Sequence, residues 1–373
     1  MTEKVAIVIL TFARWRTGSH RYHNDALLAV ACVADYNEHM KKLFLLLALA
    51  CAPLSVFSVS LSDFHLSVEP LFGMKYGELD EYVFLKECSY ASDKLSELNW
   101  EIKPLLYTGA QVSGSYRAWE LSLKGTVALP GKTGSMYDSD WLNIQYTDAA
   151  LASYQTNYSE SDNYLNSNYT WALVAGYRFW LTPHFSLKSF FAFDYEYIDF
   201  TGTGGKYWYG NTIGFDSPQR YGPYNDYRDS ENCTTGTLSG DVIGYKRESS
   251  CLWLGGEALA LFPHGLSGRL GFQLSPYIYT VSIDDHYMKG TEYADVCSGY
   301  FSALKLYATV DYAFTQQISL SLFGSYLFYF QPLRGNDYFK TIGSSSYTKS
   351  DDADGGASAH YADVSLSVKY TFF

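Results

Sequence analysis

Long runs in which apolar and polar residues alternate one by one constrain the fold of this chain more than any other feature. Between Trp119 and Leu129 the odd positions are almost all large and apolar, while the positions between them include Glu120 and Lys124. Successive side chains of a β-strand point to opposite faces, so this period of two predicts a strand with one apolar and one polar face. Charges in mid-strand are too costly on a lipid-facing surface and must therefore point to an interior.

The same alternation recurs from Asp63 onward, clearly in the runs Leu304 to Phe314 and Val364 to Phe372. Short connections alternate with long polar ones, as in barrels with tight turns at one end and long loops at the other. We predict an all-β protein, a transmembrane antiparallel β-barrel of about ten strands with long extracellular loops; a soluble β-sandwich is the alternative. The expected short turns are 115–118, 182–185, 262–265 and 315–317, and the expected outer loops are 73–92, 130–167, 200–250, 284–298 and 331–360.

Composition supports this fold and narrows the partners. The 373 residues include 35 Tyr and 23 Phe, which suit strands and membrane interfaces. The formal net charge of -12 argues against a nucleic-acid partner and favours attraction of cationic peptides.

The first sixty residues look like a targeting region. Met40-Lys41-Lys42 and the apolar run after it have the pattern of a secretory signal, and Pro53 ends that run before it could span a membrane. We therefore interpret 1–39 as a mis-assigned upstream extension, 40–60 as a signal peptide and 61–373 as the barrel. Two alternatives stay open, namely lipidation at Cys51 and a genuine extension over 1–39.

Four cysteines belong to the predicted exported chain, where an oxidising compartment permits pairing. Cys233 and Cys297 both lie in expected outer loops, so a bridge between them is our first choice, although sequence alone does not fix connectivity. No Cys-x-x-Cys spacing suggests a metal site, and His184 and His264 lie in the expected short turns. We expect no metal and no cofactor. The other two cysteines are Cys88 and Cys251.

Two pairs of polar residues could carry chemistry. In a strand, Asp284 and His286 point to the same side, and a carboxylate beside an imidazole fixes its tautomer and favours its protonated form. Asp138 and Asp140 form a second pair by the same spacing. Both pairs fall at strand ends or in adjoining loops, so we expect them at one rim of the barrel.

At these residues the chain resembles the omptin family of outer-membrane proteases. The resemblance implies a ten-stranded barrel in which Asp138 and Asp140 form an acidic couple and Asp284 and His286 the facing dyad. It further implies that His286 deprotonates a water held between the couples, without a covalent intermediate. The matching segments are 98–100, 134–141, 243–246, 284–287 and 369–372.

The family likeness is partial where specificity is set. Omptins cut between basic residues and hold the cationic side chain with acidic groups; Glu81 matches one of these, but Ser282 stands where the other is expected. A preference for Arg or Lys could therefore be relaxed. Tyr197 and Glu248 occupy positions of the basic residues that bind lipopolysaccharide in the family. Either the membrane lacks that glycolipid or the dependence has been lost.

Together these features predict an endopeptidase of the outer membrane whose active site faces the exterior. Its substrates would be exposed polypeptides, including cationic ones, cut at or near basic residues. We expect a monomer in contact with outer-membrane lipid. Two alternatives remain: an omptin-like barrel acting as an adhesin or receptor, which Ser282 and the altered lipid site favour, and a porin.

Overall fold

A computed structural model describes residues 64–86, 92–144, 146, 148–213 and 223–372 of the chain. Contacts divide the chain into two units, and the unit of residues 59–342 and 347–373 contains all the strands. The described part of the other unit is the turn at 343–346. The strands are β1 (Phe64–Leu85), β2 (Lys94–Tyr116), β3 (Trp119–Ala128), β4 (Gly131–Asp140), β5 (Asn157–Thr182), β6 (Phe185–Gly210), β7 (Cys233–Leu261), β8 (Leu266–His286), β9 (Thr291–Gly299), β10 (Ala303–Ala313), β11 (Ile318–Tyr329), β12 (Leu333–Thr341) and β13 (Thr348–Thr371), with short helices α3 (Ala149–Ala152) and η3 (Pro263–Gly265).

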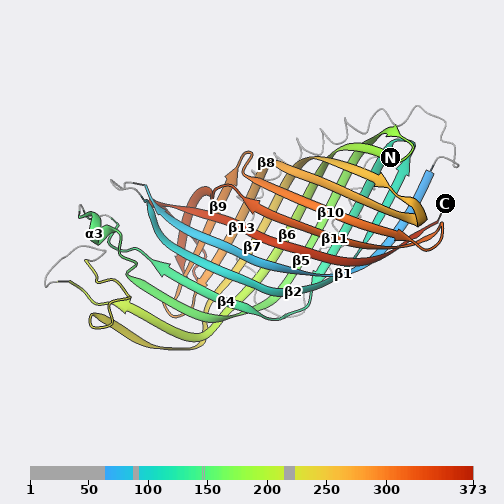
Figure 1. The fold of residues 1–373 in the computed structure, drawn as a ribbon. Helices are drawn as coiled ribbons and strands as arrows, with labels where there is room; N and C mark the ends of the chain where they lie inside the picture. The colour runs from blue at the N-terminus through green and yellow to red at the C-terminus, as the bar shows by residue number, and fades with distance from the viewer. Residues whose placement is uncertain (1–63, 87–91, 145, 147, 214–222, 373) are drawn as a thin grey trace. The chain divides into compact units, whose positions relative to one another are not determined.

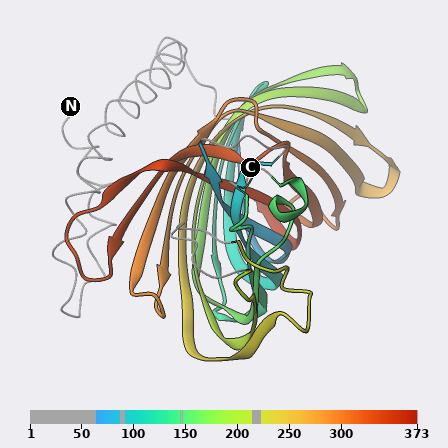
Figure 2. The same ribbon diagram turned by 90° about the vertical axis from the view of Figure 1, so that its left-hand side faces the viewer.

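The strands close into a ring because β1 pairs with both β2 and β13 (Figures 1 and 2). At one level the order is β1-β2-β3-β5-β6-β7-β8-β10-β11-β13, a ring of ten antiparallel strands. At the other level β4 replaces β3 between β2 and β5, and β9 and β12 replace β10 and β11 between β8 and β13. The prediction of a barrel of about ten strands is confirmed.

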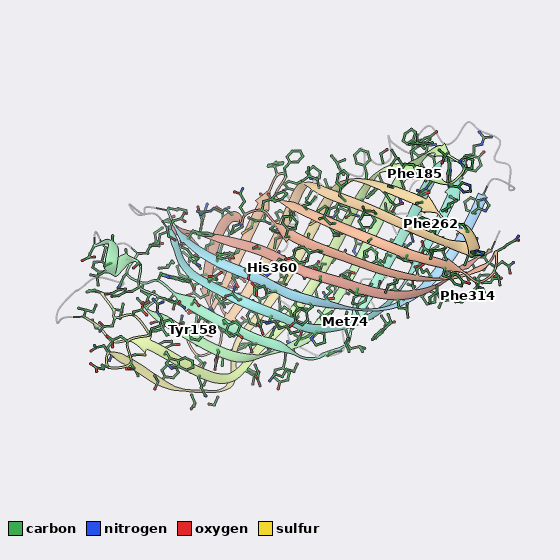
Figure 3. The ribbon with its side chains drawn as sticks, viewed as in Figure 1. Met74, Tyr158, Phe185, Phe262, Phe314 and His360 are labelled. Atoms are coloured by element: carbon green, nitrogen blue, oxygen red, sulfur yellow. The ribbon has the colours of Figure 1, made fainter. Side chains whose placement is uncertain are left out.

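The outer face of the first level is apolar, as the alternation predicts. On β3, Leu121, Leu123 and Val127 are 55%, 52% and 54% exposed, whereas Thr126 between them is buried. A continuous apolar band of this kind is stable only when lipid covers it. Exposed aromatic side chains mark the end with the short turns, where Phe185, Phe262 and Phe314 lie (Figure 3).

The connections agree with the sequence at one end only. The turns at 117–118, 183–184, 262–265 and 314–317 fall where short turns were expected; we call this the turn end and the opposite one the loop end. The expected outer loops are wrong in extent, since β1 continues to Leu85, β13 starts at Thr348, and only residues 287–290 separate β8 from β9. Beyond the lipid both faces of a strand are polar, so the alternation fades although the backbone pairing continues.

The barrel interior is filled in two ways. Near the loop end Trp100, Phe200 and Tyr245 are fully buried, and the indole stacks on both rings with centroids 5.8 and 5.1 Å away. Toward the turn end, ion pairs span a lumen whose cavity has a volume of about 280 Å³. These pairs are Arg178 with Glu120 and Glu257, Lys75 with Glu196, Lys305 with Asp194, and Arg269 with Asp311.

The predicted Cys233–Cys297 bridge is wrong, because both residues are free thiols and so is Cys251. Cys233 starts β7 beside β6, whereas Cys297 is buried on β9 between β8 and β12. Cys88, Cys51 and the predicted signal peptide lie outside the described residues. Among the described residues, no helix is long and apolar enough to cross a membrane.

Candidate active site

The carboxylate-imidazole pair lies at the last residues of β8. Asp284 and His286 share a face of the strand, and the Nε2 atom of His286 lies 2.7 Å from an oxygen of Asp284. A tight turn fixes this strand end, since the His286 carbonyl accepts hydrogen bonds from the backbone N–H groups of Lys289 and Gly290. Gly290 has a φ of 66°, which a glycine adopts readily. The Tyr293 ring packs edge-on against the imidazole.

The dyad is buried and strongly polarised. Burial by itself lowers the pKa of His286, but the neighbouring Asp284 carboxylate outweighs it, and the pKa lies above the ordinary histidine value. Asp138 adds to the rise. The second oxygen of Asp284 has no hydrogen-bond partner among the described residues. This imidazole can therefore take a proton and keep it close to a carboxylate.

The acidic couple lies on β4, where Asp138 and Asp140 point to the same side. Asn157 donates a hydrogen bond of 3.1 Å to Asp140. Desolvation by burial and the charge of Asp140 raise the pKa of Asp138 to about 7. At neutral pH the couple can consequently hold one proton, as closely spaced carboxyl groups do.

The two couples lie across the ring from each other. At the loop end β5, β6 and β7 separate β4 from β8 on one side, and five strands separate them on the other. Their charges nevertheless act on one another, because His286 lowers and Asp284 raises the pKa of Asp138. The structure thus places the four residues singled out in the sequence on facing strands at the loop end, within electrostatic reach of one another.

Sequence reasoning missed Lys289, an exposed residue in the turn after His286. Desolvation lowers the pKa of Lys289, but the carboxylates of Asp140 and Asp138 raise it by more, so the net shift is upward. The ammonium group therefore lies within electrostatic reach of the acidic couple. The position three residues after a histidine in a predicted loop carried no signal of this contact.

A second acidic group lies below the dyad. Ser282 on β8 is opposite Asp295 on β9, and Asp295 is opposite Asp337 on β12, so the three form a row across neighbouring strands. Glu81 on β1 reaches the same row, where its carboxyl group meets that of Asp295. All four side chains are buried. We call Glu81, Asp295 and Asp337 the acidic cluster.

Within the described part of the chain, the acidic cluster has no counter-charge of its own. Among the described residues, no Lys or Arg forms an ion pair with these three carboxylates; Arg247, which lies opposite Ser282, donates instead to the Ser358 carbonyl at 2.6 Å. One oxygen each of Glu81 and Asp295 has no hydrogen-bond partner there. Burial and then the charges of neighbouring carboxylates raise the pKa of both well above the ordinary range.

The acidic cluster bears on the expectation that Ser282 leaves this position without a carboxylate. Ser282 is buried and its hydroxyl has no partner among the described residues, but the residue opposite it supplies a carboxylate. Directly opposed carboxylates destabilise a sheet, so Asp295 beside Asp337 is costly for the fold alone. The sequence could have indicated Asp295 only if the tight β8–β9 hairpin had been recognised, since the register follows from that turn.

Comparison with known proteins gives one family and one similar fold. A model of the Omptin family matches residues 63–372. The crystal structure of the outer membrane protease OmpT from Escherichia coli superposes with a TM-score of 0.67 at 18% identity, covering 85% of this chain and 100% of that one. The translocator domain of the autotransporter NalP from Neisseria meningitidis reaches a TM-score of only 0.33 at 10% identity, covering 92% of this chain and 98% of that one. No curated protein sequence matches the chain.

Proposed function

Because the chain belongs to the omptin family, we propose that this outer-membrane β-barrel is an endopeptidase that activates water between Asp284–His286 and Asp138–Asp140. The observation that carries the proposal is the buried dyad, with 2.7 Å between imidazole and carboxylate, in electrostatic contact with an acidic couple on the opposite strand. General bases and acids with pKa values near neutrality are the groups that such a reaction requires.

In the proposed reaction, His286 removes a proton from water as the oxygen attacks the peptide carbonyl. Asp284 orients the imidazole and stabilises the positive charge that forms on it. The proton held by Asp138 and Asp140 forms a hydrogen bond to the carbonyl oxygen, where negative charge develops. The imidazolium then gives its proton to the leaving amine, so that the site returns to its starting state. No metal ion or covalent intermediate is needed.

The acidic cluster would bind the basic side chain of the substrate. An Arg or Lys side chain would supply the cation that Glu81, Asp295 and Asp337 lack among the described residues, and it would offer donors to their unpaired oxygens. Asp295 would act in place of the carboxylate that Ser282 does not provide. We therefore propose that the preference for basic residues is retained.

We also propose that the activity does not depend on lipopolysaccharide. Tyr197 and Glu248 lie opposite each other on β6 and β7. The hydroxyl of Tyr195 donates to Glu248 at 3.1 Å, and the Tyr169 ring stacks on Tyr197. An aromatic surface with a carboxylate offers no cation to an anionic glycolipid phosphate.

An open pore is the less favoured function. The stacked aromatic layer and the ion pairs across the lumen occupy the path along the barrel axis. Steady conductance of the wild-type protein in planar bilayers would support a porin instead.

The test uses protein purified from outer membranes in detergent and quenched peptides that differ only in Arg or Gln before the cleaved bond. Cleavage should favour Arg, be lost in His286→Ala, fall to a low residual rate in Asp138→Asn, and be unchanged by added lipopolysaccharide. His184→Ala, at the turn end, is the matched control. Retained cleavage in His286→Ala, or a folded wild-type barrel that cuts neither peptide, would refute the proposed mechanism and favour a binding role.

A further inference from the structure

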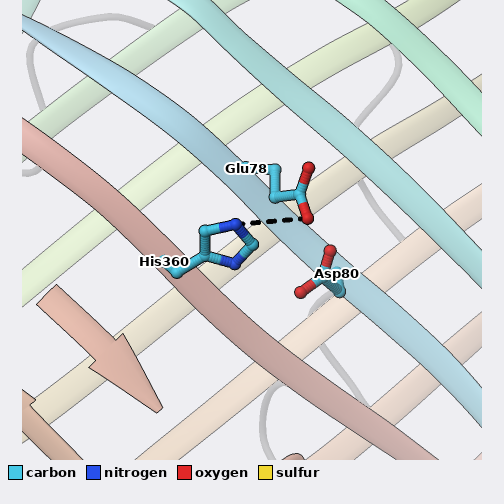
Figure 4. A group of neighbouring side chains, drawn as sticks. All are labelled: Glu78, Asp80 and His360. Carbon is cyan, nitrogen blue, oxygen red and sulfur yellow. Dashed lines mark ion pairs between the residues drawn. The ribbon is translucent and has the colours of Figure 1, made fainter.

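A cluster of one imidazole and two carboxylates joins the first strand of the barrel to the last. Glu78 and Asp80 lie two residues apart on β1, and His360 of β13 is directly opposite Glu78. Their side chains point toward one another (Figure 4), with His360 Nε2 3.3 Å from Glu78 Oε1. One nitrogen or oxygen atom of each residue lies within 4.8 Å of the others.

This cluster lies on the opposite face of the barrel wall from the candidate active site. Leu79 and Glu81, which alternate with Glu78 and Asp80, point into the barrel, so Glu78 and Asp80 point outward. The cluster begins four residues nearer the loop end than Met74, whose exposed side chain belongs to the apolar band (Figure 3). It therefore lies on the outer surface, next to the apolar band.

Asp80 has the environment of a metal-binding carboxylate. Its residue is only 4% exposed, and Asn99 donates a hydrogen bond of 2.8 Å to its Oδ1 atom, which fixes the orientation of the group. Among the described residues, neither Lys nor Arg forms an ion pair with it. Ligating carboxylates are commonly oriented by such an outer hydrogen bond. A nearly buried carboxylate beside a second carboxylate calls for a cation.

We propose that Glu78, Asp80 and His360 bind a divalent transition-metal ion, represented by Zn²⁺, which ties β1 to β13. An imidazole with two carboxylates suits Zn²⁺ better than Ca²⁺ or Mg²⁺, which prefer all-oxygen sites. Bonds of about 2.0 Å in a tetrahedral site place neighbouring ligand atoms ~3.3 Å apart, as His360 and Glu78 already are. The ligand atom of Asp80 lies within 4.8 Å of the other two, so a small shift that keeps the hydrogen bond from Asn99 completes the set, and water takes the fourth position.

The ion would stabilise the closing pair of the ring. A ligand that binds the folded barrel and not the unfolded chain raises stability in proportion to the logarithm of its concentration over Kd. β1 and β13 are the first and last strands along the chain, and their pairing closes the ring. The site would therefore act on the stability of the closed barrel without contacting substrate.

The test is titration of the tag-free protein in detergent with Zn²⁺, followed by calorimetry and thermal unfolding. His286→Ala serves as the reference, because the imidazole of the candidate active site could also bind Zn²⁺. We expect the reference to bind one Zn²⁺ and to gain thermal stability. Adding His360→Asn or Glu78→Gln should weaken binding at least tenfold and abolish the gain, whereas adding His184→Asn should change neither.

Two outcomes would overturn the proposal. One is equal Zn²⁺ affinity with and without His360→Asn, and the other is binding that disappears in His286→Ala alone. Circular dichroism of each variant without metal separates loss of binding from loss of folding. Because Glu78 and His360 are partly exposed, their substitution should leave the metal-free barrel folded.

Discussion

The two levels of the barrel interior treat buried charge in opposite ways. Toward the turn end, acidic and basic groups meet in the lumen, as Glu257 does with Arg178 at 2.7 Å. At the loop end, Glu81, Asp295 and Asp337 are buried without a basic partner among the described residues. The ion pairs of the turn end stabilise a barrel wall that separates the polar lumen from lipid. The arrangement at the loop end leaves buried carboxyl groups whose ionisation is unfavourable until a cation binds beside them, which is the property of a recognition site.

The largest effect should come from the dyad. The Asp284 carboxylate orients His286 and raises the pKa of its imidazole. Asp284→Asn removes this charge, so kcat/KM should fall by roughly 10²–10⁴-fold. The melting temperature should change little, because the variant also removes a carboxylate with an unpaired buried oxygen. Peptide cleavage and thermal unfolding measure the two quantities. A large loss of stability would place Asp284 with the structural charges of the lumen.

Glu257→Gln tests the other level. The substitution removes one of the two carboxylates that form ion pairs with Arg178 in the lumen. Breaking a buried ion pair costs about 3–5 kcal/mol of folding free energy. Urea unfolding in lipid or detergent should show this loss, while the folded fraction keeps its kcat/KM. Unchanged stability would remove the contrast between the two levels.

Asp295→Asn should alter substrate preference more than stability. Losing a charged partner for a substrate cation costs about 1–3 kcal/mol, so KM for the Arg peptide should rise roughly tenfold while the Gln peptide is little affected. Stability should stay equal or increase, since one of two opposed carboxylates is removed. A KM change shared by both peptides would contradict a role in recognition.

A backbone variant offers an independent test of the same side chain. A Cβ atom at Gly355 would lie 2.0 Å from the Asp295 carboxylate, so Gly355→Ala should displace that group and raise KM for the Arg peptide. Gly324→Ala is the matched control, because a Cβ atom there meets nothing within 4 Å. Equal KM values for the two variants would show that the position of Asp295 is unimportant.

The smallest predicted effect is a shift of the pH profile. His286 must be neutral to act as a base, and carboxylates raise its pKa, so the acid limb of kcat/KM should lie above the ordinary histidine value of 6.5. Asp138→Asn removes one of these charges and should move the limb of its residual activity to lower pH. Since an amide donates at every pH, any alkaline limb due to the acidic couple should also disappear. A shift to higher pH would contradict this assignment.

The lipid-facing half was predictable from sequence because contact with lipid requires an apolar side chain at every second position of each strand. Leu121 and Leu123 point outward as the alternation required. The loop end was less predictable, since strands wetted on both faces lose that period, and the strands there were mistaken for loops. Asp284 and His286 could be paired because they are two residues apart on one strand.

Contacts that depend on register between strands were beyond sequence reasoning. Asp295 reaches Ser282 only through the β8–β9 hairpin, and Glu78 meets His360 only because the first and last strands close the ring. The predicted bridge between Cys233 and Cys297 was wrong for the same reason. Both cysteines were expected in outer loops, and this did not reveal that they lie on the different strands β7 and β9.

The stacked layer of Trp100, Phe200 and Tyr245 has a consequence for the cell that carries this barrel. A barrel that spans a membrane risks a leak, because water along its axis would form a conducting column. Three fully buried rings interrupt that column with apolar material, into which an ion moves only at a high cost in free energy. The loop end can thus carry a group of acidic side chains while the permeability barrier of the membrane stays intact, however many copies are inserted.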